Sequence, residues 1–134
     1  RSERLPPIVV YWDTSGSRFS SEQVKFAATQ IGAIVSDARP EKTYVIQGDT
    51  HVTKVDVLEE GDVITFEPRG GGLTDFVPIF EYIEKEGIEP CCFIGITDLD
   101  GKFPSKAPEY PVIWCCDEKG ASAPFGDVIT VRMD

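Results

Sequence analysis

The feature that most constrains the fold is a short apolar segment followed directly by an amphipathic pattern. Residues 8–12 (IVVYW) are β-branched or aromatic, which is typical of a buried strand. Apolar residues then recur with helical spacing at Val24, Ala27, Ala28, Ile31, Ile34 and Val35. The spacing predicts a helix over residues 20–36, and Ser20 with Gln23 forms a capping box at its start. A buried strand that leads into a helix indicates an α/β protein.

The rest of the chain predicts further strands and a second helix. The strands occupy residues 43–48, 52–58, 91–97, 112–116 and 128–132, with a further edge piece at 63–66. The helix follows the glycine-rich segment RGGGLTDF (69–76), and Asp75 is placed to cap it. Its expected buried stripe is Phe76, Ile79, Phe80 and Ile83. Residues 49–51 are too few for a crossover, so the strands on either side pair antiparallel.

This order of elements predicts the fold class α/β. We expect an open, mostly parallel, Rossmann-like sheet of about six strands, with an antiparallel edge strand and few helices. The links at 98–111 and 117–127 are short and rich in proline or glycine, and neither has a helical pattern. We therefore expect the last strands to be poorly covered on one face, and a neighbouring domain or subunit to cover that surface. Because the chain begins RSERLPP, without methionine, residues 1–134 are predicted to be a single domain from the C-terminal part of a longer protein.

Charge and cysteine content limit the partners of this domain. The chain has 23 acidic and 13 basic residues, giving a formal net charge of −10. Such a field repels phosphate backbones, so no nucleic acid is expected as a partner. No apolar run reaches the roughly 18 residues of a membrane span, and no signal peptide is recognised, so no membrane partner is expected. The adjacent pairs Cys91–Cys92 and Cys115–Cys116 lack zinc-site spacing, and free buried thiols favour a cytoplasmic protein.

Polar side chains follow three of the predicted elements at one edge of the sheet. Asp13, Ser15 and Ser17 follow the first strand, Thr74 and Asp75 lie in the glycine-rich loop, and the 91–97 strand ends in Thr97 with Asp98 next and Asp100 two residues later. In open α/β sheets a ligand lies at the carboxyl ends of the strands, near the point where strand order reverses. These side chains offer only oxygen donors, which hard cations such as Mg²⁺ prefer.

The pattern D-x-S-x-S, followed by a distant threonine and a distant aspartate, resembles the von Willebrand factor type A (VWA) domain and its metal-ion-dependent adhesion site. The resemblance implies that Mg²⁺ or Mn²⁺ is held by Asp13, Ser15, Ser17, Thr74 and Asp98. It also implies that the metal binds an acidic side chain of a partner. The domain would then be an interaction or assembly module without catalysis of its own.

A more specific resemblance is to the VWA-like domain at the C-terminus of prokaryotic and phage proteins, where it follows a metallopeptidase-like domain. The segments DTSGS, GGG-TDF-P, TD-DGKFP, YPVIWC and PFGDVI carry this resemblance across residues 8–131. The acidic ligand would belong to a protein partner or to that N-terminal domain. Leu73 departs from the pattern, since a glycine is expected before Thr74.

Two other functions stay open. The domain could be a non-catalytic regulatory part of a hydrolase or metallopeptidase-like protein. Alternatively, Asp98 and Asp100 could serve a metal-dependent phosphohydrolase, since paired aspartates of this spacing act as nucleophile and acid. A serine hydrolase is disfavoured because His51, the single histidine, is predicted in a turn. An aspartic protease is disfavoured because the element pattern is α/β.

Overall fold

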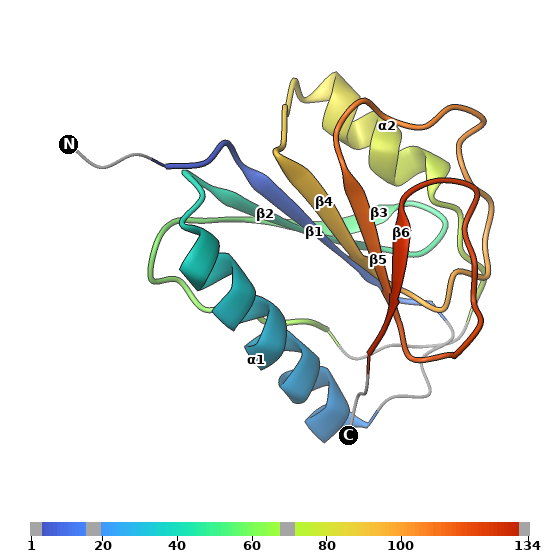
Figure 1. The fold of residues 1–134 in the computed structure, drawn as a ribbon, viewed down its shortest axis with the longest axis horizontal. Helices are drawn as coiled ribbons and strands as arrows, with labels where there is room; N and C mark the ends of the chain where they lie inside the picture. The colour runs from blue at the N-terminus through green and yellow to red at the C-terminus, as the bar shows by residue number, and fades with distance from the viewer. Residues whose placement is uncertain (1–3, 16–19, 68–71, 132–134) are drawn as a thin grey trace.

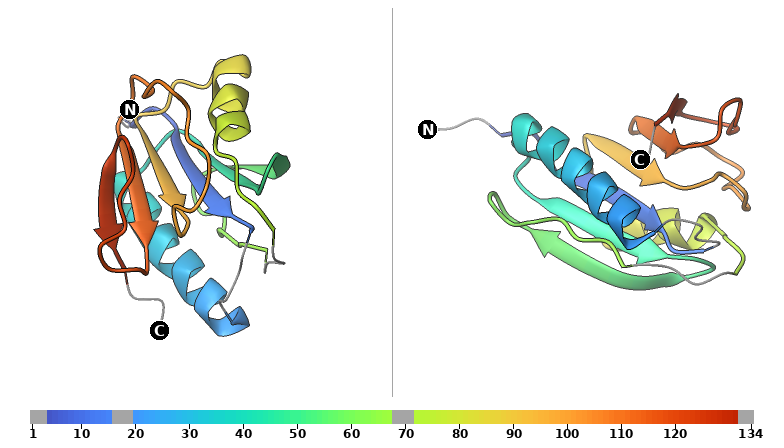
Figure 2. Two further views of the ribbon diagram at one scale, coloured as in Figure 1. Left: turned by 90° about the vertical axis from the view of Figure 1, so that its right-hand side faces the viewer. Right: turned by 90° about the horizontal axis from the view of Figure 1, so that it is seen from below.

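The computed structural model describes residues 4–15, 20–67 and 72–131, which form three layers (Figure 1). The helices are α1 (Ser21–Ala38) and α2 (Val77–Lys85). The strands are β1 (Ile8–Asp13), β2 (Thr43–Gly48), β3 (Val52–Leu58), β4 (Cys92–Ile96), β5 (Val112–Cys116) and β6 (Asp127–Thr130). Figure 2 shows α1 and α2 on opposite faces of the sheet, and each helix packs in its own hydrophobic cluster.

The sheet has the predicted mixed topology. Within the described residues it contains six strands in the order β3-β2-β1-β4-β5-β6. β1 pairs in parallel with both β2 and β4, and the parallel pairing continues through β5 to β6. β2 and β3 pair antiparallel, because the turn between them is too short for a crossover. The chain passes from β1 to β2 on one side and later returns to β4 on the other, so strand order reverses at β1.

The central strand β1 is buried along its whole length because a helix covers each face. Val10 and Trp12 pack in the cluster that contains α1, whereas Val9 and Tyr11 pack in the cluster that contains α2. Successive residues of a strand point to opposite faces, so this apolar run supplies both halves of the core.

The first helix begins with the predicted capping box, whereas the N-cap of the second lies one residue after the predicted cap. The Ser20 side chain accepts a hydrogen bond from the Gln23 backbone N–H, and Gln23 Oε1 accepts one from the Ser20 backbone N–H. In α2 the N-cap is Phe76, which makes no side-chain cap hydrogen bond; Asp75 lies one residue earlier, where its Oδ1 accepts from the Val77 N–H at 2.9 Å. All four residues of the expected α2 stripe are buried. Neither helix in the described part of the chain combines the length and apolarity needed to cross a membrane.

The edge piece predicted at 63–66 is wrong, because these residues form no strand. Instead the segment lies against the α1 side of the core. Phe66 stacks on Trp12 with ring centroids 4.5 Å apart and planes 3° from parallel. Glu67 joins side chains through its backbone: its carbonyl accepts from Trp12 Nε1 at 2.9 Å, and its N–H donates to Gln47 Oε1 at 2.8 Å. The backbone next to this segment therefore bonds side chains and not the backbone of a neighbouring strand.

The links after β4 and β5 contain no helix, as expected, but they do not leave the α2 side of the last strands bare. Their side chains join the α2 cluster, namely Leu99, Phe103, Tyr110, Ala121, Ala123 and Phe125. Phe103 and Phe125 both contact Trp114 of β5, with ring centroids 5.6 and 6.2 Å away. The α2 side of the last strands is therefore covered, since loop aromatics take the place of a helix, and the poorly covered face is not on this side. On β6, Ile129 is 47% exposed.

The four cysteines are free thiols, as predicted. Cys115 and Cys116 are buried, whereas Cys91 and Cys92 are partly buried. Burial raises the pKa of Cys92 and of Cys115 to about 11. These thiols therefore behave as apolar core groups.

Candidate metal centre

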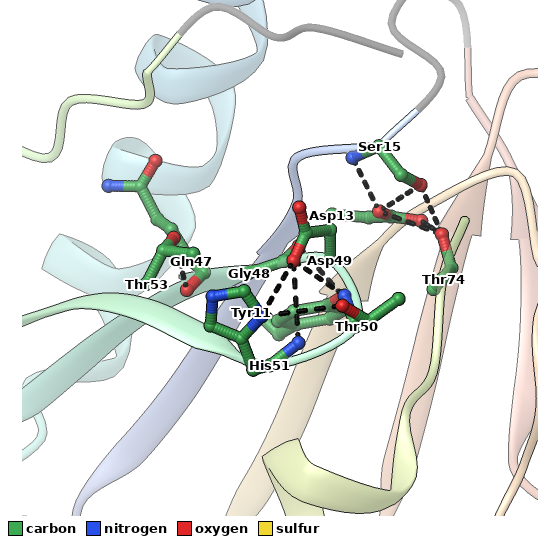
Figure 3. Close-up of polar contacts among 10 residues, drawn as sticks. All are labelled: Tyr11, Asp13, Ser15, Gln47, Gly48, Asp49, Thr50, His51, Thr53 and Thr74. Atoms are coloured by element: carbon green, nitrogen blue, oxygen red, sulfur yellow. Dashed lines mark hydrogen bonds and ion pairs between the residues drawn. The ribbon is translucent and has the colours of Figure 1, made fainter. Parts of the chain in front are cut away.

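The candidate site is built around Asp13, the last residue of β1. The buried strand carries this carboxylate to the carboxyl edge of the sheet, where the residue is 7% exposed. Asp13 Oδ1 accepts hydrogen bonds from the Ser15 backbone N–H at 2.9 Å and from Ser15 Oγ at 2.7 Å (Figure 3). This local ring holds Ser15 beside the end of the strand.

Two threonines from other segments complete the hydrogen bonding of Asp13. Thr74, from the loop before α2, donates from Oγ1 toward both carboxylate oxygens, each 3.2 Å away, and its hydroxyl also contacts Ser15 Oγ. Thr97, directly after β4, donates from Oγ1 to Asp13 Oδ2 at 2.5 Å. Both threonines are less than a tenth exposed. Hydroxyl groups from three separate segments thus converge on one carboxylate.

Asp98 lies next to this cluster, in the turn that follows β4. Its Oδ1 accepts from the Asp100 N–H at 2.9 Å, and Leu99 between them has a φ of 67°, in the left-handed region. The Leu99 N–H donates to Thr97 Oγ1 at 3.1 Å, so the same turn also fixes the threonine that donates to Asp13. Asp98 is partly buried and contributes a second negative charge to the site.

The electrostatics of the site disfavour the charged form of Asp13. Burial raises the pKa of Asp13 above its ordinary value of 3.8, and the negative charge of Asp98 raises it further. Hydrogen bonds from Thr97 and Ser15 act in the opposite direction. Within the described residues, no basic side chain forms an ion pair with Asp13. Among the residues that the structure describes, Asp13 and Asp98 therefore lie near one another with no basic side chain paired to Asp13.

This donor set fits a hard divalent cation. It consists of carboxylate and hydroxyl oxygens, the ligands that Mg²⁺ and Mn²⁺ accept. A cation would supply positive charge beside Asp13 and favour its ionised form. No three His, Cys, Asp or Glu side chains form a metal cluster in the described part of the chain. The site described here differs from such a cluster, because most of its donors are hydroxyls.

The single histidine is not joined to these hydroxyls. His51 lies in the β2–β3 turn, where its Nδ1 is 3.5 Å from Asp49 Oδ1 and 3.3 Å from Thr50 Oγ1 (Figure 3). Asp49 in turn accepts from the backbone N–H groups of Thr50 and His51. Among the hydrogen bonds of the described residues, none links His51 to Ser15. In the described part of the chain, His51 is therefore not placed as a base for Ser15.

The sequence prediction identified most of this cluster. Asp13, Ser15 and Thr74 are joined by hydrogen bonds, and Asp98 lies close enough to act on Asp13. Ser17 lies outside the described residues, as do Gly70 and Gly71 of the glycine-rich loop. Leu73 is 79% exposed, so its side chain does not fill the space around Asp13.

Thr97 was predicted to lie in the polar cluster but not to be a metal ligand, and the structure shows that it bonds Asp13 directly. The available signal was its place: a threonine immediately after a buried strand and immediately before Asp98. Backbone position alone does not reveal which way its side chain points, so its contact with Asp13 needed the structure.

The fold and the residues at its carboxyl edge together define a VWA-like α/β domain. The chain belongs to the family described as VWA-like domain (DUF2201), whose model matches residues 8–132. It is similar to an uncharacterised protein of Thermotoga maritima, with 33% identity over 85 residues. That match covers 63% of this chain and 21% of the relative, so the chain spans about a fifth of the relative's length.

A solved structure has the same fold. The crystal structure of the ArnB paralog VWA2 from Sulfolobus acidocaldarius superimposes with a TM-score of 0.61 over 86% of this chain and 35% of that one. The sequence identity is 18%, so this likeness concerns the fold alone.

Proposed function

We propose that this domain is a Mg²⁺- or Mn²⁺-dependent protein-interaction module that binds an acidic side chain of a partner. The observation that supports the proposal most strongly is the convergence of hydroxyl groups from three separate segments on buried Asp13. This cluster lies where strand order reverses, the usual ligand position of an open α/β sheet.

Each residue has a distinct role in this proposal. Asp13 and Asp98 supply negative charge, and the hydroxyl groups of Ser15 and Thr74 supply neutral oxygen donors. Ser17 would add a third hydroxyl, by the family pattern. Neutral donors leave the bound cation with positive charge and an open coordination position, which suits an Asp or Glu carboxylate from a partner. The partner is a carboxylate of another protein or of a preceding domain.

Isothermal titration tests the metal step. Wild type should bind Mg²⁺ and Mn²⁺, and Asp13→Ala should not, because Asp13 is the residue on which the other donors converge. Asp100→Asn is a matched control: it removes a neighbouring carboxylate that is exposed, so its Mg²⁺ affinity should stay within about twofold of wild type. Circular dichroism should show all three proteins folded. No heat of binding for wild type with either cation would refute the proposal.

A regulatory role within a longer protein is the second candidate. It is favoured by the Thermotoga relative, since the matched region makes up 21% of that protein. The two ideas are compatible, because the acidic ligand can come from another domain of the same chain. This role would be supported if the activity of the full-length protein depends on Mg²⁺ and is lost in Asp13→Ala. The isolated catalytic part should keep its activity.

A phosphohydrolase at Asp98 and Asp100 has less support. The Asp98 carboxylate accepts the Asp100 N–H and so closes a turn, and Asp100 is exposed. Hydrolysis of p-nitrophenyl phosphate with Mg²⁺, abolished in Asp100→Asn, would favour this alternative over an interaction module.

A further inference from the structure

Two loops at the candidate site are joined through their backbones. Phe76 donates its N–H to the carbonyl of Lys102 at 2.8 Å, and Lys102 donates its N–H to the carbonyl of Thr74 at 3.3 Å. Asp75 and Lys102 thereby form an isolated parallel bridge. The loop that carries Thr74 is thus attached to the turn that carries Asp98, although they are far apart in the sequence.

Gly101 lies where these loops come closest. A Cβ atom on residue 101 would lie 2.9 Å from Thr74 Cβ, 2.9 Å from Thr74 Cγ2 and 2.9 Å from the Thr74 carbonyl oxygen. Real Cβ atoms essentially never approach other atoms so closely, so a side chain at 101 requires Thr74 or the backbone at 101 to shift. The φ of Gly101 is not in the left-handed region. Glycine is therefore required here because a side chain has no room, and not because of the backbone conformation.

The displaced group would be the hydroxyl that contacts Asp13. Thr74 is 8% exposed, with its Oγ1 directed at both oxygens of Asp13 and its methyl group against Gly101. Its backbone is held by Lys102 on one side, and Asp75 donates its N–H to the Asp49 carbonyl at 3.0 Å on the other. Thr74 is therefore fixed by tight packing as well as by hydrogen bonds.

We propose that Gly101 is the positioning residue that holds the Thr74 hydroxyl in place and thereby makes the site selective for Mg²⁺ over Ca²⁺. This inference rests on the proposed metal binding. Mg²⁺ requires short distances and near-ideal octahedral geometry, whereas Ca²⁺ tolerates longer and more variable ones. A rigid donor favours the smaller ion, and a donor that is displaced or free to move loses that preference.

Calorimetric titration of wild type and Gly101→Ala with Mg²⁺ and, separately, with Ca²⁺ tests the proposal. Wild type should prefer Mg²⁺. Gly101→Ala should lose about tenfold or more in Mg²⁺ affinity, as is usual when the support of a metal ligand is altered. Its Ca²⁺ affinity should change by less than about threefold, so the Mg²⁺/Ca²⁺ ratio falls. Gly32→Ala is the matched control, since a Cβ there has no heavy atom within 4 Å and should change neither affinity.

Thr74→Ser gives a second test if Gly101→Ala does not fold. It keeps the hydroxyl and removes the methyl group that packs on Gly101, so the Mg²⁺/Ca²⁺ ratio should fall here too. If both cations bind either folded variant with the wild-type ratio, the positioning role of Gly101 is overturned while the proposed function stands. If wild type binds neither Mg²⁺ nor Mn²⁺, both proposals are overturned.

Discussion

Replacing Thr97 by valine should destabilise the domain markedly at neutral pH. Thr97 Oγ1 donates to the buried Asp13 carboxylate at 2.5 Å and accepts from the Leu99 N–H at 3.1 Å. Losing a hydrogen bond to a charged group costs about 1.5–3 kcal/mol, and leaving a buried N–H unpaired costs about 1–3 kcal/mol. Because the two contributions share one hydroxyl and are not additive, we expect a loss of about 2–4 kcal/mol. Valine has nearly the same shape as threonine, so the cavity contribution is small.

The measurement is urea unfolding in metal-free buffer at neutral pH, followed by tryptophan fluorescence. Thr97→Ser keeps the hydroxyl and should lose less than about half as much stability as Thr97→Val. Thr43→Val is the matched control. Thr43 is 4% exposed, and no hydrogen bond of its side chain is found among the described residues. Thr43→Val should therefore lower the free energy of unfolding by no more than about 0.5 kcal/mol.

The pH dependence provides an independent check. Burial raises the pKa of Asp13 above 3.8, so the folded state binds this proton more tightly than the unfolded state. The stability that this proton contributes is fully present below the pKa of Asp13 in the unfolded state. It is lost as pH rises through the higher pKa of Asp13 in the folded state. Thr97 supports the charged form, so the difference between wild type and Thr97→Val should grow with pH across this range. A difference under about 0.5 kcal/mol at pH 7, or one that does not change with pH, would refute the reasoning.

Two further predictions concern the core. Gly95→Ala should cost about 1–3 kcal/mol, because the added Cβ would lie 2.7 Å from Trp114 Cε3; unchanged urea unfolding would contradict this packing. Cys92 and Cys115, with pKa values raised to about 11, should react with iodoacetamide at pH 8 far more slowly in the folded protein than in urea. Mass spectrometry of the alkylated peptides measures both rates, and equal rates in the two states would show that these thiols are not protected.

The strand and helix order was predictable from the sequence because each element has a clear apolar period. The runs that became β2, β3 and β5 match their predicted bounds, since turn residues or charges flank them. The segment at 63–66 was not predictable in this way. Its apolar side chains do enter the core, but its backbone pairs with no strand, and Glu67 instead bonds the side chains of Trp12 and Gln47. An apolar pattern indicates that a segment is buried. A buried segment does not have to pair with a neighbouring β-strand.

The site was predictable where residues follow strand ends, and less so where contacts depend on side-chain direction. Asp13 ends the apolar run of β1 and Asp98 comes two residues after the end of β4, so the topology alone brings them to one edge. The sequence placed Thr97 at this edge, but its contact with Asp13 was not predictable, because its hydroxyl meets Asp13 only once β4 lies beside β1. The fit of Gly101 against Thr74 likewise joins residues whose proximity no local pattern encodes.

The burial of Asp13 bears on how such domains evolve. The fold holds a carboxylate where its charge is disfavoured, and the core around it consists of apolar side chains that do not need it. An uncharged residue at position 13 would remove that electrostatic penalty, but it would leave the hydroxyl groups of Ser15, Thr74 and Thr97 without their shared acceptor. Burial and hydrogen bonding therefore act in opposite directions on the acidic residue at this position. A substitution there is easiest where the surrounding hydroxyl residues change with it.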